Sequence, residues 1–203
     1  MTGSPKLVDL GCGAGGCSMG YYRAGFDVTG VDIRPQPNYP FTFVQADAMT
    51  FPLDGFDAIH WSPICQGHAN VTAWRGDPAS YEDQLTPALA RLSAQPLPWV
   101  VENVPEALPT WDYVLCGTSF GLPIRRHRGF RRGNWTGYEL LPPCRCYRNP
   151  AVRPFEHKDE RAYTDAMGCT WMTRDEGRQA IPPAYTEHIG LQLMAHLTEG
   201  AAA

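Results

Sequence analysis

The chain has 203 residues, a net charge of −4 and 43% hydrophobic residues, enough for one sizeable α/β domain with a buried core. No apolar run approaches the roughly 18 residues that a membrane span needs, and residues 1–13 lack the basic and apolar regions of a secretory signal. The seven cysteines are scattered along the chain, which favours a reducing, cytoplasmic setting.

Strands and helices alternate through the first half of the chain. Apolar runs predict strands over residues 6–10, 27–33, 41–47, 56–62 and 99–104. Helical spacing predicts one helix over residues 17–26 and another over 80–95. This alternation predicts an α/β fold with a doubly wound, mostly parallel sheet.

The two helices carry further local signals. In the first helix, three residues are spaced for a buried face: Met19, Tyr22 and Phe26. In the second helix, Ser80 is the expected cap, and Pro87 predicts a kink or a late start.

The second half of the chain is less regular. Two short strands are expected within residues 113–123 and 126–135, and residues 136–162 show no clear period. A helix is expected over 182–197, because prolines suit a first helical turn.

A glycine-rich turn follows the first expected strand and precedes a helix. Its motif, D-x-G-x-G-x-G, consists of Asp9, Gly11, Gly13 and Gly15. Glycines there let the backbone bend tightly and approach a ligand closely. The second and third strands end near Asp32 and Asp47, at the same edge of the sheet. These acidic strand ends favour a cationic nucleoside such as S-adenosylmethionine over NAD, with Ile33 packing on the adenine.

Five short motifs follow one another along the chain. They read LVDLGCGAGGCSMGYYRAGFDVTGVDI, SPICQ, VVENV, FGLPIRRHRGF and RQAIPPAYTEHIG. In kind and order they resemble the motifs of the DNA (cytosine-5) methyltransferases, particularly short phage-type members, over most of residues 7–195. The resemblance implies a class I, Rossmann-like methyltransferase fold and S-adenosylmethionine as cofactor.

The resemblance also implies a catalytic set. Cytosine C5 does not attack a methyl sulfonium unaided, but a thiolate that adds at C6 converts the ring into an enamine. Cys65 is the implied thiolate, and Glu102 would contact the N3 and N4 edge of the base. Arg126 or Arg128 would hold the O2 edge, and Asn103 is expected to join loops. A base in a duplex would have to be flipped out to reach them.

Charge is unevenly distributed. Residues 121–155 hold eight arginines and one acid, Glu139, for a net charge of +7, whereas the rest of the chain carries −11. A solvated arginine surface is one explanation, but clustered arginines on an acidic body are also typical of phosphate binding. We therefore expect DNA as the partner. The expected substrate contacts are Gln66, Arg131, Arg132, Arg145 and Arg148.

Little of the chain is left for the DNA-reading domain that this family carries between the arginine motif and the last motif. We expect a SAM-binding and catalytic core over residues 1–134, a small insert over 135–170, and a segment over 171–203 that completes the core. A zinc site in the insert is one alternative, and its ligands would be Cys144, Cys146, His157 and Cys169. Because Cys-x-Cys is poor zinc spacing, no metal ligand is assigned.

Two other functions stay open. The small recognition region and the acidic body are compatible with C5 methylation of a free pyrimidine nucleotide. The chain is also compatible with a DNA-binding accessory subunit that needs a partner chain, although the intact set of Cys65, Glu102 and Arg128 argues against this. The cytoplasm is the expected location, that of the host cell if the protein is phage-encoded.

Overall fold

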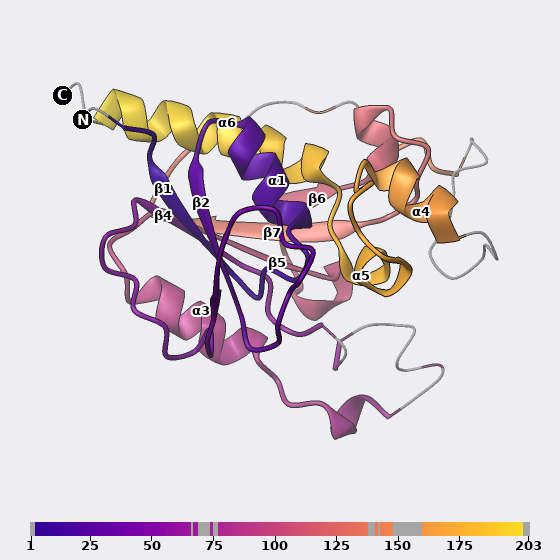
Figure 1. The fold of residues 1–203 in the computed structure, drawn as a ribbon, viewed down its shortest axis with the longest axis horizontal. Coiled ribbons are helices and arrows are strands. Elements are labelled where there is room, and N and C mark those ends of the chain that lie inside the picture. Colours follow the sequence, from indigo (N-terminus) through magenta and orange to yellow (C-terminus); the bar gives the residue numbers. More distant parts are fainter. Residues whose placement is uncertain are drawn as a thin grey trace.

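The fold is built on one seven-stranded sheet (Figure 1). The computed structural model describes residues 3–65, 67–68, 74, 77–137, 141, 143–147 and 160–200. The strands are β1 (Lys6–Leu10), β2 (Asp27–Asp32), β3 (Thr42–Gln45), β4 (Ala58–Trp61), β5 (Trp99–Asn103), β6 (Tyr113–Leu115) and β7 (Arg128–Gly133). Their order is β3-β2-β1-β4-β5-β7-β6, and every pairing is parallel except those of β7. The expected doubly wound, mostly parallel sheet is confirmed.

Helices cover both faces of the sheet (Figure 1). The helices α1 (Gly16–Arg23) and α6 (Pro183–Gly200) lie on one face, and α3 (Leu85–Ser93) lies on the other. Two further helices, α4 (Glu160–Met167) and α5 (Arg174–Gln179), lie near the glycine turn, where Trp171 Nε1 donates to the Ala14 carbonyl over 2.8 Å. Short 3₁₀ turns occupy Pro78–Ser80, Pro105–Ala107 and Gly117–Phe120. No helix in the described ranges is long and apolar enough to cross a membrane.

The central strands are apolar because both of their faces are covered. All residues of β4 and β5 are buried, as expected of parallel strands between two helical layers. One core cluster joins the sheet to Tyr21 of α1 and Ile189 of α6. A second joins the opposite face to Leu85 and Leu92 of α3.

Glycines let α1 and α6 pack closely. A Cβ atom built on Gly20 would lie 2.1 Å from Thr186 Oγ1, so only hydrogen fits there. Because of this contact, the face of α1 that carries Gly20 is buried against α6. The prediction that Tyr22 lies on the buried face of this helix is therefore wrong. The Tyr22 side chain is 56% exposed, whereas Tyr21 is fully buried.

Two other expectations need correction. The helix expected over residues 80–95 starts late, at Leu85, which is one of the two outcomes predicted from Pro87, but Ser80 does not cap it. Instead, Asp83 Oδ1 accepts from Leu85 N at 2.9 Å, since a carboxylate is a good acceptor for free N–H groups in a first turn. The strand expected within residues 113–123 ends at Leu115, and the 3₁₀ turn Gly117–Phe120 follows.

Candidate active site

The glycine turn leaves open space at the carboxyl edge of β1. Gly11, Gly13 and Gly15 all have positive φ, at 70°, 49° and 86°. A Cβ on Gly11 would lie 2.6 Å from the Ser62 carbonyl oxygen, so the turn passes tightly beside the loop after β4. A Cβ on Gly13 would meet nothing within 4 Å. The backbone of Gly13 is therefore free for a ligand to approach.

The ends of β2 and β3 supply polar and apolar groups at the same edge. Asp32 Oδ2 accepts from Gly13 N at 3.1 Å, and its Oδ1 accepts from Arg34 N at 2.9 Å. The next side chain, Ile33, is 66% exposed. Asp47 Oδ1 accepts from Met49 N at 2.8 Å. An exposed apolar side chain beside two carboxylates suits the adenine and ribose of a nucleoside.

Asp9, the acid of the turn motif, lies inside the protein. It is fully buried, and Ser18 Oγ donates to its Oδ2 over 2.5 Å. Tyr39 donates in turn to Ser18 Oγ at 2.8 Å. Burial raises the pKa of Asp9 to about 7, and the charges of Asp32 and Glu102 add to this. Asp9 Oδ1 has no hydrogen-bond partner among the described residues.

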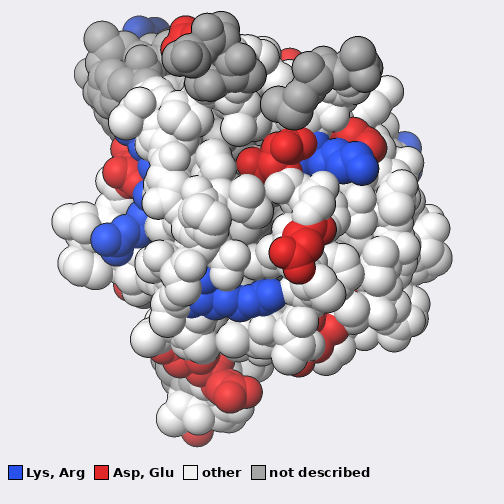
Figure 2. All heavy atoms as spheres, turned by 90° about the vertical axis from the view of Figure 1, so that its left-hand side faces the viewer, with Lys and Arg blue, Asp and Glu red and all other residues white. Residues whose placement is uncertain are grey.

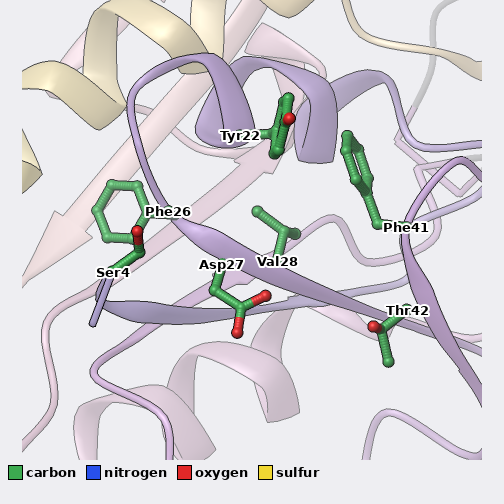
Figure 3. Close-up of a pocket in the computed structure, with 7 residues that line it drawn as sticks. All are labelled: Ser4, Tyr22, Phe26, Asp27, Val28, Phe41 and Thr42. Carbon is green, nitrogen blue, oxygen red and sulfur yellow. The ribbon is translucent and has the colours of Figure 1, made fainter. Parts of the chain in front are cut away.

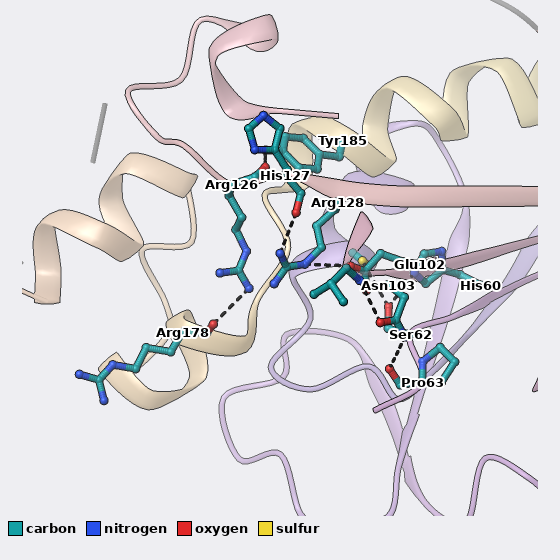
Figure 4. A network of polar contacts seen from close by, with 12 residues as sticks. His60, Ser62, Pro63, Glu102, Asn103, Arg126, His127, Arg128, Arg178 and Tyr185 are labelled. Carbon is teal, nitrogen blue, oxygen red and sulfur yellow. Dashed lines mark hydrogen bonds and ion pairs between the residues drawn. The ribbon is translucent and has the colours of Figure 1, made fainter. Parts of the chain in front are cut away.

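The expected catalytic residues come together because β4 and β5 are parallel neighbours. Cys65 lies four residues after the end of β4, and Glu102 lies near the end of β5, at the same edge of the sheet. The antiparallel strand β7 begins at that edge with Arg128. Arg128 Nε lies 3.0 Å from Glu102 Oε1, and Arg128 Nη1 donates to the His127 carbonyl over 2.8 Å (Figure 4). The sheet thus gathers residues far apart in sequence.

The electrostatics of this group fit a thiol that needs activation. Burial and the charge of Glu102 raise the pKa of Cys65, while Arg128 and Arg126 lower it. Burial also raises the pKa of Glu102, which the same two arginines and a hydrogen bond with Ser62 partly oppose. The Cys65 thiol is therefore easier to ionise when Glu102 is protonated, and Glu102 is easier to ionise when Cys65 is protonated.

Arg126 and Arg128 have different surroundings. Arg126 is buried between the C-terminal helices, and its Nη1 donates to the Tyr163 hydroxyl. Its Nη2 donates to the Arg178 carbonyl over 3.1 Å (Figure 4). Tyr185 donates to the Arg126 carbonyl over 2.6 Å. Arg128, not Arg126, pairs directly with Glu102. The sequence left Arg126 and Arg128 as alternatives, and the structure distinguishes them by their contacts with Glu102.

Sequence reasoning missed a buried polar chain behind Glu102. The Tyr21 hydroxyl lies 3.0 Å from His60 Nδ1, and His60 Nε2 lies 3.0 Å from Ser62 Oγ. Ser62 hydrogen-bonds to Glu102, and burial lowers the pKa of His60 to about 3, so the imidazole is neutral at physiological pH. The single sequence signal was a histidine inside an apolar strand. Asn103 joins loops as expected, because its Nδ2 donates to the Pro63 carbonyl over 3.2 Å.

The expected substrate residues do not form one group. Gln66 and Arg148 lie outside the described residues. Arg131 and Arg132 pair with Val101 and Val100, so they lie one and two positions farther along β7 than Phe130, the partner of Glu102. Arg132 also donates to Tyr113 Oη over 2.9 Å and stacks on Trp135, which occupies it within the fold. Arg145 is exposed.

The surface also has a hollow and a face of mixed charge. A hollow of about 340 Å³ lies against the amino ends of β2 and β3, lined in part by Asp27 and Thr42 (Figure 3). It is at the opposite end of the sheet from Cys65. On the face shown in Figure 2, acidic and basic side chains are interspersed among the described residues without a large basic patch.

Similar folds are found among solved structures, whereas no family model and no curated protein sequence matches the chain. The Schizosaccharomyces pombe Dnmt2 methyltransferase is 12% identical, over 95% of this chain and 99% of that chain, with a TM-score of 0.63. This chain has the class I methyltransferase fold. The Entamoeba histolytica methyltransferase EhMeth is 11% identical, over 98% of this chain and 99% of that chain, with a TM-score of 0.59.

A third similar structure is larger. It is a putative DNA modification methyltransferase encoded within an E. coli prophage, 23% identical over 63% of this chain, with a TM-score of 0.46. The matched part covers 45% of that chain, so this chain spans less than half its length.

Proposed function

We propose that this chain methylates C5 of cytosine in DNA, using S-adenosylmethionine and a covalent bond from Cys65 to C6 of the base. The observation that carries the proposal is the meeting of Cys65 with the Glu102–Arg128 ion pair at the carboxyl edge of the sheet. Ligands of doubly wound sheets bind at this edge.

The glycine turn is suited to hold the cofactor. The open space in front of Gly13 admits its methionine part, and Ile33 offers an apolar surface to its adenine. Asp32 and Asp47 would accept hydrogen bonds from the ribose hydroxyls and the adenine amine. When bound, S-adenosylmethionine supplies the methyl group that C5 of the activated cytosine accepts.

Cys65 and Glu102 carry the proton chemistry. A proton moves from the Cys65 thiol to the buried carboxylate of Glu102, which leaves a thiolate and a neutral acid. The thiolate adds to C6 while Glu102 donates its proton to N3, so the ring becomes a neutral enamine. Arg128 stabilises negative charge that develops at O2 during the addition. After methylation, the C5 proton passes to water, N3 returns its proton to Glu102, and Cys65 leaves C6.

A free pyrimidine nucleotide is the second candidate substrate. The observation that favours it is the position of Arg131 and Arg132, which lie farther along β7 than Arg128, the residue that pairs with Glu102. The arginines that remain at the edge are few enough for one phosphate group.

One experiment separates the candidates. The protein is incubated with S-adenosylmethionine and, in separate reactions, with duplex DNA or dCMP, and the nucleosides are analysed by mass spectrometry. We expect 5-methyldeoxycytidine from the duplex. A product from dCMP alone would establish the nucleotide reaction, and the absence of product from both would favour the accessory-subunit alternative.

A further inference from the structure

Four potential metal ligands converge beside residues 125–128, which we call the arginine loop. We call this group the cysteine–histidine cluster; its members are Cys116, His127, Cys144 and Cys146. Their ligand atoms all lie within 4.8 Å of one another. They come from three segments: the end of β6, the loop before β7, and residues 143–147. Because the chain brings them together from distant positions, sequence spacing alone could not reveal the group.

The separations fit tetrahedral coordination. His127 Nε2 lies 3.4 Å from Cys144 Sγ and 3.8 Å from Cys146 Sγ, and the two sulfurs lie 3.2 Å apart. With Zn–S near 2.3 Å and Zn–N near 2.0 Å, a tetrahedron places sulfurs about 3.8 Å apart and nitrogen about 3.5 Å from sulfur. All seven cysteines are free thiols, so no disulfide competes for these sulfurs.

We propose that the cysteine–histidine cluster binds one Zn²⁺ ion as a closed structural site. Three thiolates and one neutral imidazole are a common ligand set for structural zinc. On binding, the three thiols release their protons to solvent, and the loaded site carries a net charge of −1. All four coordination positions are then filled by the protein, so this ion is structural. The assignment is independent of the proposed methyl transfer.

The surroundings of the sulfurs fit this role. Thr118 Oγ1 lies 3.4 Å from Cys116 Sγ and donates to Cys144 Sγ over 3.6 Å. The backbone N–H of Arg126 also hydrogen-bonds to the sulfur of Cys116. Donors around metal-bound thiolates offset their charge and fix their orientation.

The set differs from the one considered from the sequence. Cys144 and Cys146 belong to both. Cys169 is fully buried in a separate apolar cluster with Ile124 and Met167, and His157 lies outside the described residues. Cys116 and His127 take their places.

The zinc would fix the arginine loop. His127 stands between Arg126 and Arg128, and its carbonyl accepts the hydrogen bond that orients the Arg128 guanidinium (Figure 4). The same ion ties residues 143–147 to β6. Zinc binding by Cys116, Cys144 and Cys146 would thus hold His127, the residue next to Arg128, in place.

Metal content tests the site directly. The protein is purified without added metal, and zinc is measured by inductively coupled plasma mass spectrometry. We expect one zinc per chain. Replacement by Co²⁺ should give the intense visible bands of a tetrahedral site and a near-ultraviolet thiolate-to-cobalt charge-transfer band.

Variants locate the ligands. Cys144→Ser and Cys146→Ser should each lower zinc affinity at least tenfold, measured by competition with a chromogenic chelator. The matched control, Cys169→Ala, should keep one zinc. If the ligand variants fail to fold, titration of wild-type thiols with a mercurial, which should release one zinc per chain, takes their place. Absence of zinc with no cobalt–thiolate band, iron with acid-labile sulfide, or a disulfide within the cluster would each overturn the assignment.

Discussion

Arg128 Nε lies 3.0 Å from Glu102 Oε1, across the antiparallel pairing of β7 with β5. The side chain of Glu102 is almost fully buried, yet its Oε1 has no well-aligned hydrogen bond among the described residues. The ion pair therefore balances charge and leaves the carboxyl able to accept or donate toward a base. It also sets the electrostatic conditions under which Cys65 ionises.

The first prediction concerns that ionisation. Glu102→Gln removes a negative charge that raises the pKa of Cys65, so the pKa of this thiol should fall. The pH profile of Cys65 alkylation by iodoacetamide, read by peptide mass spectrometry, should shift to lower pH. Arg128→Met is the paired variant. It removes a charge that lowers the same pKa, so its profile should shift to higher pH. Shifts in the same direction for both variants would contradict the electrostatic account.

The second prediction concerns the nucleophile. Cys65→Ser should lower turnover by roughly 10³-fold or more, because a serine hydroxyl is a far weaker nucleophile, while S-adenosylmethionine binding by calorimetry stays unchanged. With S-adenosylmethionine present, duplex DNA carrying 5-fluorocytosine should form a stable adduct with the wild-type protein, since after methylation of C5 the fluorine cannot leave as a proton does. Cys169→Ala is the control and should form the same adduct. Near-normal turnover by the serine variant would assign the nucleophile elsewhere.

The third prediction concerns the cofactor. Asp32→Ala should weaken S-adenosylmethionine binding by about 1–3 kcal/mol, because a hydrogen-bond acceptor at the carboxyl edge is lost. Asp27→Ala, at the other end of the same strand, is the matched control and should bind normally. Isothermal titration calorimetry measures both. Equal affinity in the two variants would remove Asp32 from the cofactor site.

The fourth prediction concerns DNA. Arg145 is exposed and its backbone N–H donates to Thr118 Oγ1 over 3.1 Å, whereas Arg131 is exposed on β7. If Arg145 neutralises one phosphate, Arg145→Gln should reduce the slope of log K against log salt by about 0.9, and Arg131→Gln should leave it unchanged. Fluorescence anisotropy over a salt series measures this. A larger effect from Arg131 would place the DNA along β7 instead.

The fifth prediction concerns stability and pH. Burial raises the pKa of Asp9 to about 7, above its ordinary value of 3.8. Because the folded state holds this proton more tightly, the stabilisation is fully present below pH 3.8 and is lost as the pH rises through about 7. The free energy of unfolding of the wild type should therefore fall relative to that of Asp9→Asn across this range, by a few kcal/mol at most. Urea titrations at several pH values measure the difference, and parallel pH profiles would contradict it.

The sheet was predictable because its strands have clear patterns in the sequence. Apolar runs such as that of β5 need cover on both faces, and glycine turns mark where strand passes to helix. The order of motifs then placed Cys65 and Glu102 at one edge. The exact ends of α3 and β6 were not predictable, because a nearby aspartate and a tight turn decided them.

The remaining details depend on contacts between distant segments. Nothing local in the sequence tells Arg126 from Arg128, since the difference comes from Tyr163 and Arg178 in later helices. The same holds for Arg132, whose partners Tyr113 and Trp135 occupy it. The number of arginines gives the charge of a segment, but it does not give the position or the contact partners of each arginine side chain.

The packing of α6 on α1 has a consequence for synthesis on the ribosome. Tyr185, Ile189 and Leu193 of α6 complete the core around Tyr21, and Tyr185 also holds the backbone of Arg126. A nascent chain in which the glycine turn and Cys65 have already left the ribosome therefore still lacks the α6 residues that complete its core. Its apolar α1 face stays open to solvent, or to a chaperone, until α6 emerges from the exit tunnel. The backbone of Arg126 thus gains its contact with Tyr185 only late in translation.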